Sequence, residues 1–133
     1  MFFNNETDYA IRIVSCLAEK NEKTDAATIS EQTGVTLRFA LKILHRLVLG
    51  GIVKSFKGNK GGYMLAKDPS EITLLEVVEK INGPVTLSRC HVDGSCGCTH
   101  PNGFCNFKNT FLDVTEYIKR RLSEANFSNK EEN

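Results

Sequence analysis

The sequence lacks several features that would place it in common classes of protein. No apolar run is long enough to span a membrane. The N-terminus reaches Glu6 and Asp8 before any apolar run develops and has no small-residue cleavage site, which argues against a secretory signal and favours a cytoplasmic location. No Cys-x-x-Cys motif occurs, and no grouping of His, Asp and Ser forms a recognisable catalytic set. These absences argue against an enzyme such as a thiol oxidoreductase.

Acidic residues are also missing from one long stretch of the chain. Between Gln32 and Lys67 there is no Asp or Glu, although the net charge of the whole chain is only +1. The basic residues of this acid-free stretch are Arg38, Lys42, Arg46, Lys54, Lys57, Lys60 and Lys67. A neutral protein that concentrates positive charge in one segment can neutralise DNA phosphates there, although a solvated basic face without a partner has the same composition.

The spacing of apolar residues predicts a mainly α-helical chain. With 133 residues, 41% of them hydrophobic and 25% charged, the chain is suited to one compact core. Apolar residues recur at helical spacing from Thr7 onward, where Cys16 is interpreted as a small core residue. A short second helix ends at Gly34, and a third runs from Thr36, its N-cap, to Gly50. Two helices joined by a short turn are typical of a helix-turn-helix.

The third predicted helix has the features of a DNA-recognition helix, whose first residues meet base edges in the major groove. Its helical periodicity predicts a buried stripe of Leu37, Ala40, Leu41, Leu44, Leu47 and Val48. The exposed faces then carry Arg38, Lys42, His45 and Arg46. We therefore predict that Thr36, Arg38 and Lys42 contact bases, with Arg38 suited to a bidentate contact with guanine.

The residues after Gly51 predict a β-hairpin. The run IVKSF alternates apolar and polar residues, KGNKGG is a turn, and YMLA is a returning strand. The glycines of the turn allow close approach to a phosphate, so we predict that Lys57 and Lys60 contact the DNA backbone or the minor groove. The predicted fold is thus a winged helix-turn-helix, mainly α with a small β-hairpin wing, whose reading head spans Thr28 to Leu65.

Three segments are expected: a DNA-binding domain at residues 1–84, a cysteine-rich sensor loop at 85–106, and a helix with a polar tail at 107–133. Thr73 and Glu76 match a capping box that opens a short helix before Gly83. The last segment predicts a long helix with one apolar face, formed by Phe107, Phe111, Val114, Ile118 and Leu122. Because so large a face on a small chain needs a partner helix, we expect a homodimer. The tail from Ser123 is expected to be frayed.

The order of these segments resembles the Rrf2 family of winged-helix repressors, which includes regulators of the IscR, NsrR and CymR types. The resemblance extends from about Thr7 to Leu122, and its most specific parts are the wing KGNKGGYMLAKDP and the following helix EITLLEVVEKING. It implies a homodimer whose long C-terminal helices pair and whose two reading heads bind a pseudo-palindromic operator in double-stranded DNA. In cluster-binding members, it further implies that loop cysteines hold an iron-sulfur cluster whose state controls DNA binding.

Four of the five cysteines, Cys90, Cys96, Cys98 and Cys105, are crowded into one short segment. In a reducing cytosol such crowding favours metal or thiol chemistry over disulfides. Because thiolates are the usual ligands of iron-sulfur clusters, we predict that these four hold a 2Fe-2S or 4Fe-4S cluster, which an aerobically prepared sample can lack. The gaps typical of the family fit Cys98 better than Cys96 as the middle ligand, but either residue remains a candidate.

The fourth ligand is open as well. After the fourth cysteine, the next candidate is Asp8, which stands where NsrR-type relatives supply an acidic ligand from the other subunit, followed by His91 or His100. The histidine that follows the last cysteine in IscR-type relatives is absent here. A structural zinc site is disfavoured by the tight Cys-x-Cys spacing. The alternative to cluster control is a metal-free regulator that responds to thiol oxidation or, as in CymR-type members, to a protein or metabolite partner.

Overall fold

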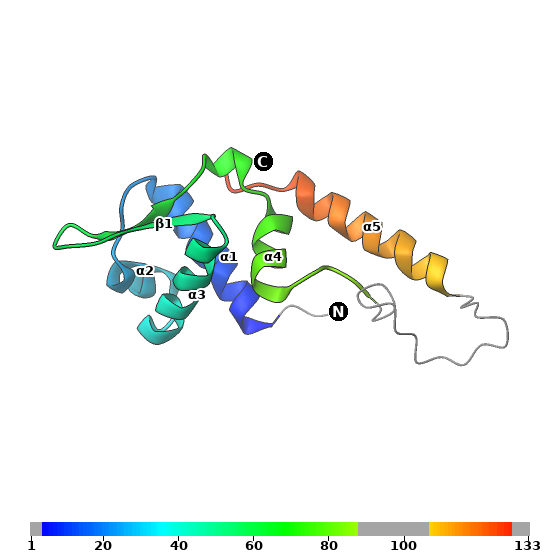
Figure 1. The fold of residues 1–133 in the computed structure, drawn as a ribbon, viewed down its shortest axis with the longest axis horizontal. Coiled ribbons are helices and arrows are strands. Elements are labelled where there is room, and N and C mark those ends of the chain that lie inside the picture. Colours follow the sequence, from blue (N-terminus) through cyan, green and yellow to red (C-terminus); the bar gives the residue numbers. More distant parts are fainter. Residues whose placement is uncertain (1–3, 88–106, 129–133) are drawn as a thin grey trace.

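The structure, a computed structural model, describes residues 4–87 and 107–128. In chain order these residues form α1 (Asn5–Lys20), α2 (Ala26–Thr33), α3 (Leu37–Leu49), β1 (Val53–Phe56), β2 (Gly62–Leu65), a 3-10 turn (Pro69–Glu71), α4 (Leu74–Asn82) and α5 (Lys108–Glu124). Figure 1 shows α1 to α4 gathered together, with the β-hairpin projecting on one side and α5 extending away on the other. This is the predicted winged helix-turn-helix with a long C-terminal helix.

Short polar side chains begin three of the helices, as capping rules require. Asn4 accepts a hydrogen bond from the Thr7 N–H at 2.9 Å and so caps α1. Thr36 accepts from the Phe39 N–H at 3.4 Å, and Thr73 accepts from the Glu76 N–H at 3.1 Å. The boundaries predicted at Thr36 and Thr73 are therefore confirmed.

The core consists mainly of aliphatic side chains of α1, α3 and α4, with contributions from the segments between them. Its fully buried large residues include Ile13, Leu17, Ile29, Ile43, Leu44, Leu47, Ile52, Ile72 and Val77. Cys16 is 8% exposed and its thiol donates to Gln32 Oε1 at 3.5 Å, which confirms that it is a core residue of α1. Burial raises the pKa of the Cys16 thiol, because the thiolate is poorly solvated there.

The predicted buried stripe of α3 is correct in part and wrong at two leucines. Ala40, Leu44 and Leu47 are buried as expected, but Leu37 and Leu41 are 46% and 44% exposed. The fourth buried residue of α3 is Ile43. The reason is that α3 packs against both α1 and α4, which rotates the buried face toward Ile43 and leaves the two leucines at its opposite edge.

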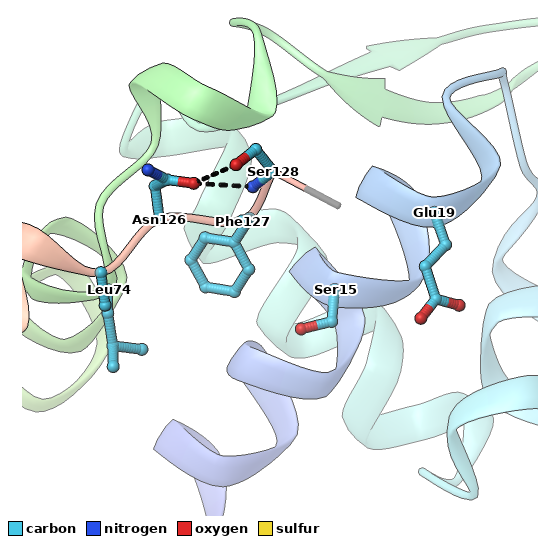
Figure 2. A pocket seen from close by; sticks show the side chains of 7 residues that line it. Ser15, Glu19, Leu74, Asn126, Phe127 and Ser128 are labelled. Carbon is cyan, nitrogen blue, oxygen red and sulfur yellow. Dashed lines mark hydrogen bonds between the residues drawn. The ribbon is translucent and has the colours of Figure 1, made fainter. Parts of the chain in front are cut away.

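Residues 125–128 pack against the body, contrary to the frayed tail expected from Ser123, whereas residues 129–133 of that predicted tail lie outside the described residues. After α5 ends at Glu124, the chain returns beside the start of α4, where the Leu74 N–H donates to the Ala125 carbonyl at 2.9 Å. The Phe127 N–H donates to the Pro69 carbonyl at 3.1 Å, and Figure 2 shows the Phe127 ring between Leu74 and α1. Phe127 packs against the core, so burial of an aromatic ring outweighs the polar character of its neighbours.

Helix α5 is the most exposed helix of the fold. Thr115 is its only buried residue, whereas Phe107, Phe111, Val114 and Tyr117 are all exposed. Phe107 and Phe111 contact each other, with ring centroids 6.5 Å apart. Within residues 4–87 and 107–128, no helix has the length and hydropathy needed to span a membrane.

Candidate nucleic-acid interface

The turn between α2 and α3 is held by several local hydrogen bonds. Gly34 adopts φ +74°, a conformation that favours glycine, and its N–H donates to the Ser30 carbonyl at 3.0 Å. The Ser30 hydroxyl donates to the Val35 carbonyl at 2.6 Å, and Val35 is buried. Because these bonds cross the turn, they set the direction of α3 relative to α2, as a helix-turn-helix requires.

The exposed start of α3 carries the residues predicted to read bases. Thr36 and Arg38 are exposed, and within the described parts of the chain Arg38 has neither a hydrogen bond nor an ion pair. Lys42 is also exposed, but its ammonium lies 2.6 Å from Glu6 Oε1 at the start of α1. Arg38 is therefore free to contact a ligand. Lys42 must first release the Glu6 carboxylate before it can do so.

Arg46, which the sequence places on an exposed face of α3, joins three helices instead. Its Nη1 lies 2.7 Å from Glu6 Oε2, and its Nη2 donates to the Ile81 carbonyl near the end of α4 at 2.6 Å. Glu6 thus receives both Lys42 and Arg46. The pKa of Glu6 lies below its ordinary value, chiefly because Lys42 donates a hydrogen bond to the carboxylate, with further lowering from the two positive charges.

The wing is anchored to the loop between α1 and α2. Strands β1 and β2 pair antiparallel, with Val53 opposite Leu65 and Phe56 opposite Gly62. Tyr63 of β2 also exchanges two backbone hydrogen bonds with Thr24, at 2.9 and 2.8 Å. A side chain at residue 62 would lie 2.9 Å from the Thr24 carbonyl oxygen, so this position requires glycine because of the protein's own backbone.

Ion pairing reduces the number of free charges in the acid-free stretch. Lys42 and Arg46 pair with Glu6, and Lys67 pairs with Glu76 at 2.7 Å. Within the acid-free stretch, the basic residues that form no ion pair with a described residue are Arg38, Lys54, Lys57 and Lys60. All four are exposed and lie on α3 or the wing. Helix α3 and the wing thus keep four unpaired positive charges.

Sequence reasoning missed one basic residue beside the wing. The Lys23 ammonium lies 4.7 Å from the centroid of the Phe56 ring, a cation–π contact. Lys23 stands between Glu22 and Asp25, so a search for runs of positive charge passes over it. Only the pairing of Thr24 with Tyr63 brings Lys23 to the wing, and no local sequence signal predicts that pairing.

The predicted metal ligands lie almost entirely outside the described residues. These are Cys90, Cys96, Cys98 and Cys105 together with His91 and His100. The remaining candidate, Asp8, is exposed on the first turns of α1 and its carboxylate lies 2.9 Å from the Arg12 guanidinium. Among residues 4–87 and 107–128, no three His, Cys, Asp or Glu side chains gather as a metal site.

Two matches to known sequences identify the relatives of this chain. The model of the Rrf2 family, described as iron-dependent transcriptional regulators, matches residues 3–129. The HTH-type transcriptional regulator IscR of Escherichia coli is 39% identical over 70 residues, a match that covers 53% of this chain and 43% of that protein. The match therefore spans less than half the length of these curated relatives.

Solved structures share the fold at low sequence identity. CymR, the global cysteine regulator of B. subtilis, is 19% identical and superposes with a TM-score of 0.78 over 96% of this chain and 93% of its own. IscR of T. potens is also 19% identical, with a TM-score of 0.74 over 96% of this chain and 83% of its own. At such identities the likeness shows the fold alone.

Proposed function

Because the chain belongs to the Rrf2 family of transcriptional regulators, we propose that it regulates transcription by binding an operator in double-stranded DNA through its reading head. One observation carries this proposal: α3 and the wing carry four exposed basic residues without an ion pair to a described residue, Arg38, Lys54, Lys57 and Lys60, in a stretch that contains no Asp or Glu. Unpaired positive charge on a recognition helix and a hairpin matches the polyanionic backbone of DNA. Relatives of this family are regulators of transcription, which also argues against an enzyme.

The first turns of α3 supply the base contacts in this proposal. Arg38 is unpaired and suited to the acceptor pair of guanine, and Lys42 joins it once DNA displaces Glu6. Thr36 uses its hydroxyl oxygen as a cap and retains the hydroxyl hydrogen for a base acceptor. The two exposed leucines, Leu37 and Leu41, add apolar surface for thymine methyl groups.

The active form in this proposal is a cytoplasmic homodimer. The exposed apolar side chains of α5, from Phe107 to Tyr117, favour pairing with the same helix of a second copy. A two-fold dimer presents two reading heads, so its operator is pseudo-palindromic with half-sites about one helical turn or a multiple apart. Lys57 and Lys60 on each wing then contact phosphates or the minor groove beside each half-site.

We further propose that the cysteine segment controls DNA binding. Four thiols, Cys90, Cys96, Cys98 and Cys105, form a donor set suited to a 2Fe-2S or 4Fe-4S cluster. Asp8 fits the role of the alternative fourth ligand, supplied to the cluster of a second copy, because its carboxylate is exposed and held only by a surface ion pair with Arg12. Both IscR and CymR share the fold, so control by thiol oxidation or by a metabolite or protein partner remains the alternative.

The test of DNA binding begins with selection of duplexes from a random-sequence library by the full-length protein. We expect one enriched pseudo-palindromic motif. Arg38→Ala should cost about 1 to 3 kcal/mol on that motif and relax the preference at one guanine. Lys60→Ala should weaken binding to all duplexes alike and reduce the slope of log affinity against log salt by about one.

Lys108→Ala is the matched control, since Lys108 is exposed on α5, outside the reading head. This variant should bind like the unaltered protein. Enrichment of no motif, or equal losses for Lys60→Ala and Lys108→Ala, would contradict the proposed interface.

The test of the cysteine segment is anaerobic purification followed by absorption and paramagnetic resonance spectra. A cluster predicts visible absorption with iron and sulfide in stoichiometric amounts, all lost when Cys90, Cys96, Cys98 and Cys105 are changed to serine. A colourless protein with stoichiometric zinc would overturn the cluster. Unchanged regulation after the fourfold substitution would favour a metabolite or protein partner instead.

A further inference from the structure

A cavity lies between α5 and the residues that follow α4, away from the reading head. Its volume is about 340 Å³, and Val85, Leu112, Thr115, Glu116 and Lys119 are among its lining residues. Val85 is fully buried and Leu112 is partly buried, so one part of the wall is apolar. Thr115, Glu116 and Lys119 bring a hydroxyl, a carboxylate and an ammonium to the same cavity.

The hydroxyl belongs to Thr115, which is only 4% exposed. Its Oγ1 is fully buried and has no hydrogen-bond partner, the one such side-chain atom among the residues that the structure describes. Buried hydroxyls in native proteins are nearly always hydrogen-bonded, and a helical threonine usually bonds the carbonyl four residues earlier. A ligand group in the cavity would give this atom a hydrogen-bond partner that the described residues do not supply.

The two charges at the cavity are also unpaired. Glu116 and Lys119 stand one turn apart on α5 with opposite charges, yet in the described parts of the chain neither forms an ion pair. Later on the same helix, Glu124 pairs with Arg121 at 2.8 Å and approaches Arg120 at 4.0 Å. The carboxylate and the ammonium beside Thr115 are thus both available to a ligand.

The cavity lies on a different flank of α5 from the exposed apolar residues. At 3.6 residues per turn, Leu112, Glu116 and Lys119 share one flank, whereas Phe111, Val114 and Tyr117 turn toward the other. Pairing of two α5 helices through the apolar flank would leave the cavity accessible. The cavity can therefore serve a ligand in the monomer and in the dimer.

We infer that this cavity binds a small zwitterion of the α-amino-acid class. Its ammonium group pairs with Glu116, its carboxylate pairs with Lys119, and one of its polar atoms satisfies the Thr115 hydroxyl. A short side chain packs against Val85 and Leu112. This inference does not depend on the DNA-binding function, since none of these residues belongs to the reading head.

The first experiment measures binding of the common L-amino acids, one at a time, to the full-length protein at constant ionic strength. We expect at least one to shift the amide resonances of Val85 and Thr115 and to raise the melting temperature in a concentration-dependent way. Ethanolamine lacks the carboxylate and glycolate lacks the ammonium, so neither should reproduce the effect. No response to any amino acid, or an equal response to these two probes, overturns the inference.

The second experiment uses variants of α5. Thr115→Val keeps the side-chain shape and removes the unpartnered hydroxyl, so the free protein should melt no lower than before while amino-acid binding weakens about tenfold. Thr110→Val is the matched control, because Thr110 is exposed on the same helix and does not line the cavity. Glu116→Gln and Lys119→Gln should each weaken binding as well.

A clear loss of stability in ligand-free Thr115→Val would mean that the hydroxyl is already satisfied, for example by a single bound water, and that the cavity is only hydrated. Undiminished binding by this variant would also overturn the inference. Weaker binding by Thr110→Val to the same extent would show that the effect does not arise at the cavity.

Discussion

Helices α3 and α5 are both amphipathic, but the fold leaves different faces of them uncovered. Four residues of α3 are buried, and its uncovered face carries Arg38, Lys42 and His45. Only one residue of α5 is buried, and its uncovered side includes Phe107, Phe111, Val114 and Tyr117. A charged free face is suited to a polyanion, whereas an aromatic free face is suited to another protein surface. In the proposed function, the two helices therefore divide DNA binding and dimerisation between them.

The largest expected effect is the loss of unfolding free energy after a substitution on the buried face of α3. Leu44 is fully buried in the core, so Leu44→Ala should lower the free energy of unfolding by about 2 to 5 kcal/mol. Leu41 is the matched control, because it is the same residue type three positions earlier and 44% exposed. Leu41→Ala should change the free energy of unfolding by less than about 1 kcal/mol. Urea denaturation of both variants gives the comparison.

Equal losses of unfolding free energy for Leu44→Ala and Leu41→Ala would show that Leu41 is buried as well as Leu44. In that case the predicted stripe that included Leu41 would be correct, and the face proposed for DNA would be smaller than the structure indicates.

The apolar face of α5 should show the next largest effect. Val114→Lys places a charge in the middle of this face and should weaken dimerisation by about 1 to 3 kcal/mol, since a buried, unpaired charge is costly at an interface. Asn109→Lys adds the same charge on another side of the same helix and should leave the dimer intact. Analytical ultracentrifugation over a range of concentrations measures both.

If the unaltered protein is monomeric, the role in dimerisation proposed for α5 is wrong. Equal dissociation of the two variants would instead move the interface away from Val114.

Substitutions on the exposed face of α3 should lower operator affinity by different amounts. Arg38 is unpaired while Lys42 is held by Glu6, so Arg38→Ala should cost more operator affinity than Lys42→Ala. We expect about 1 to 3 kcal/mol for Arg38 and less than about 1 kcal/mol for Lys42, because DNA must first displace the Glu6 carboxylate. Fluorescence anisotropy with the selected duplex measures both losses, and the reverse order would contradict the role assigned to Glu6.

Local rules predicted much of the reading head. Gly34, Thr36, Gly50 and Thr73 mark helix ends because glycine and short polar side chains satisfy the backbone there, whatever the rest of the chain does. The wing was predicted by alternation and turn residues in the same way. These signals act within a few residues, so a single sequence contains them in full.

Features that depend on distant contacts could not be predicted in this way. Glu6 lies far from Lys42 and Arg46 in sequence, so the two ion pairs that neutralise part of the basic stretch have no local signal. The exposure of Leu37 and Leu41 depends on which neighbours cover α3, because periodicity defines a stripe only to within about one position. The metal ligands proposed at Cys90 to Cys105 stay predictions from spacing and chemistry.

The smallest expected effect concerns Glu6 at the start of α1, which forms ion pairs with Lys42 and Arg46 of α3. Its pKa is lowered below its ordinary value of 4.5, chiefly by the hydrogen bond from Lys42. A carboxylate whose pKa is lower in the folded state stabilises the fold above its unfolded pKa and loses this effect as the pH falls through the folded pKa. Glu6→Gln should therefore be less stable than the unaltered protein at pH 7.

The difference between the two should shrink at pH values below about 4.5, because protonated Glu6 is neutral like glutamine. Glu31→Gln is the control, since Glu31 is exposed on α2 and has no ion pair in the described parts of the chain. That variant should match the unaltered protein at every pH. Urea denaturation between pH 3 and pH 7 measures the three curves. A Glu6→Gln deficit that persists undiminished at pH 3 would mean that Glu6 acts through its shape, and that Lys42 is free for DNA without any exchange of partners.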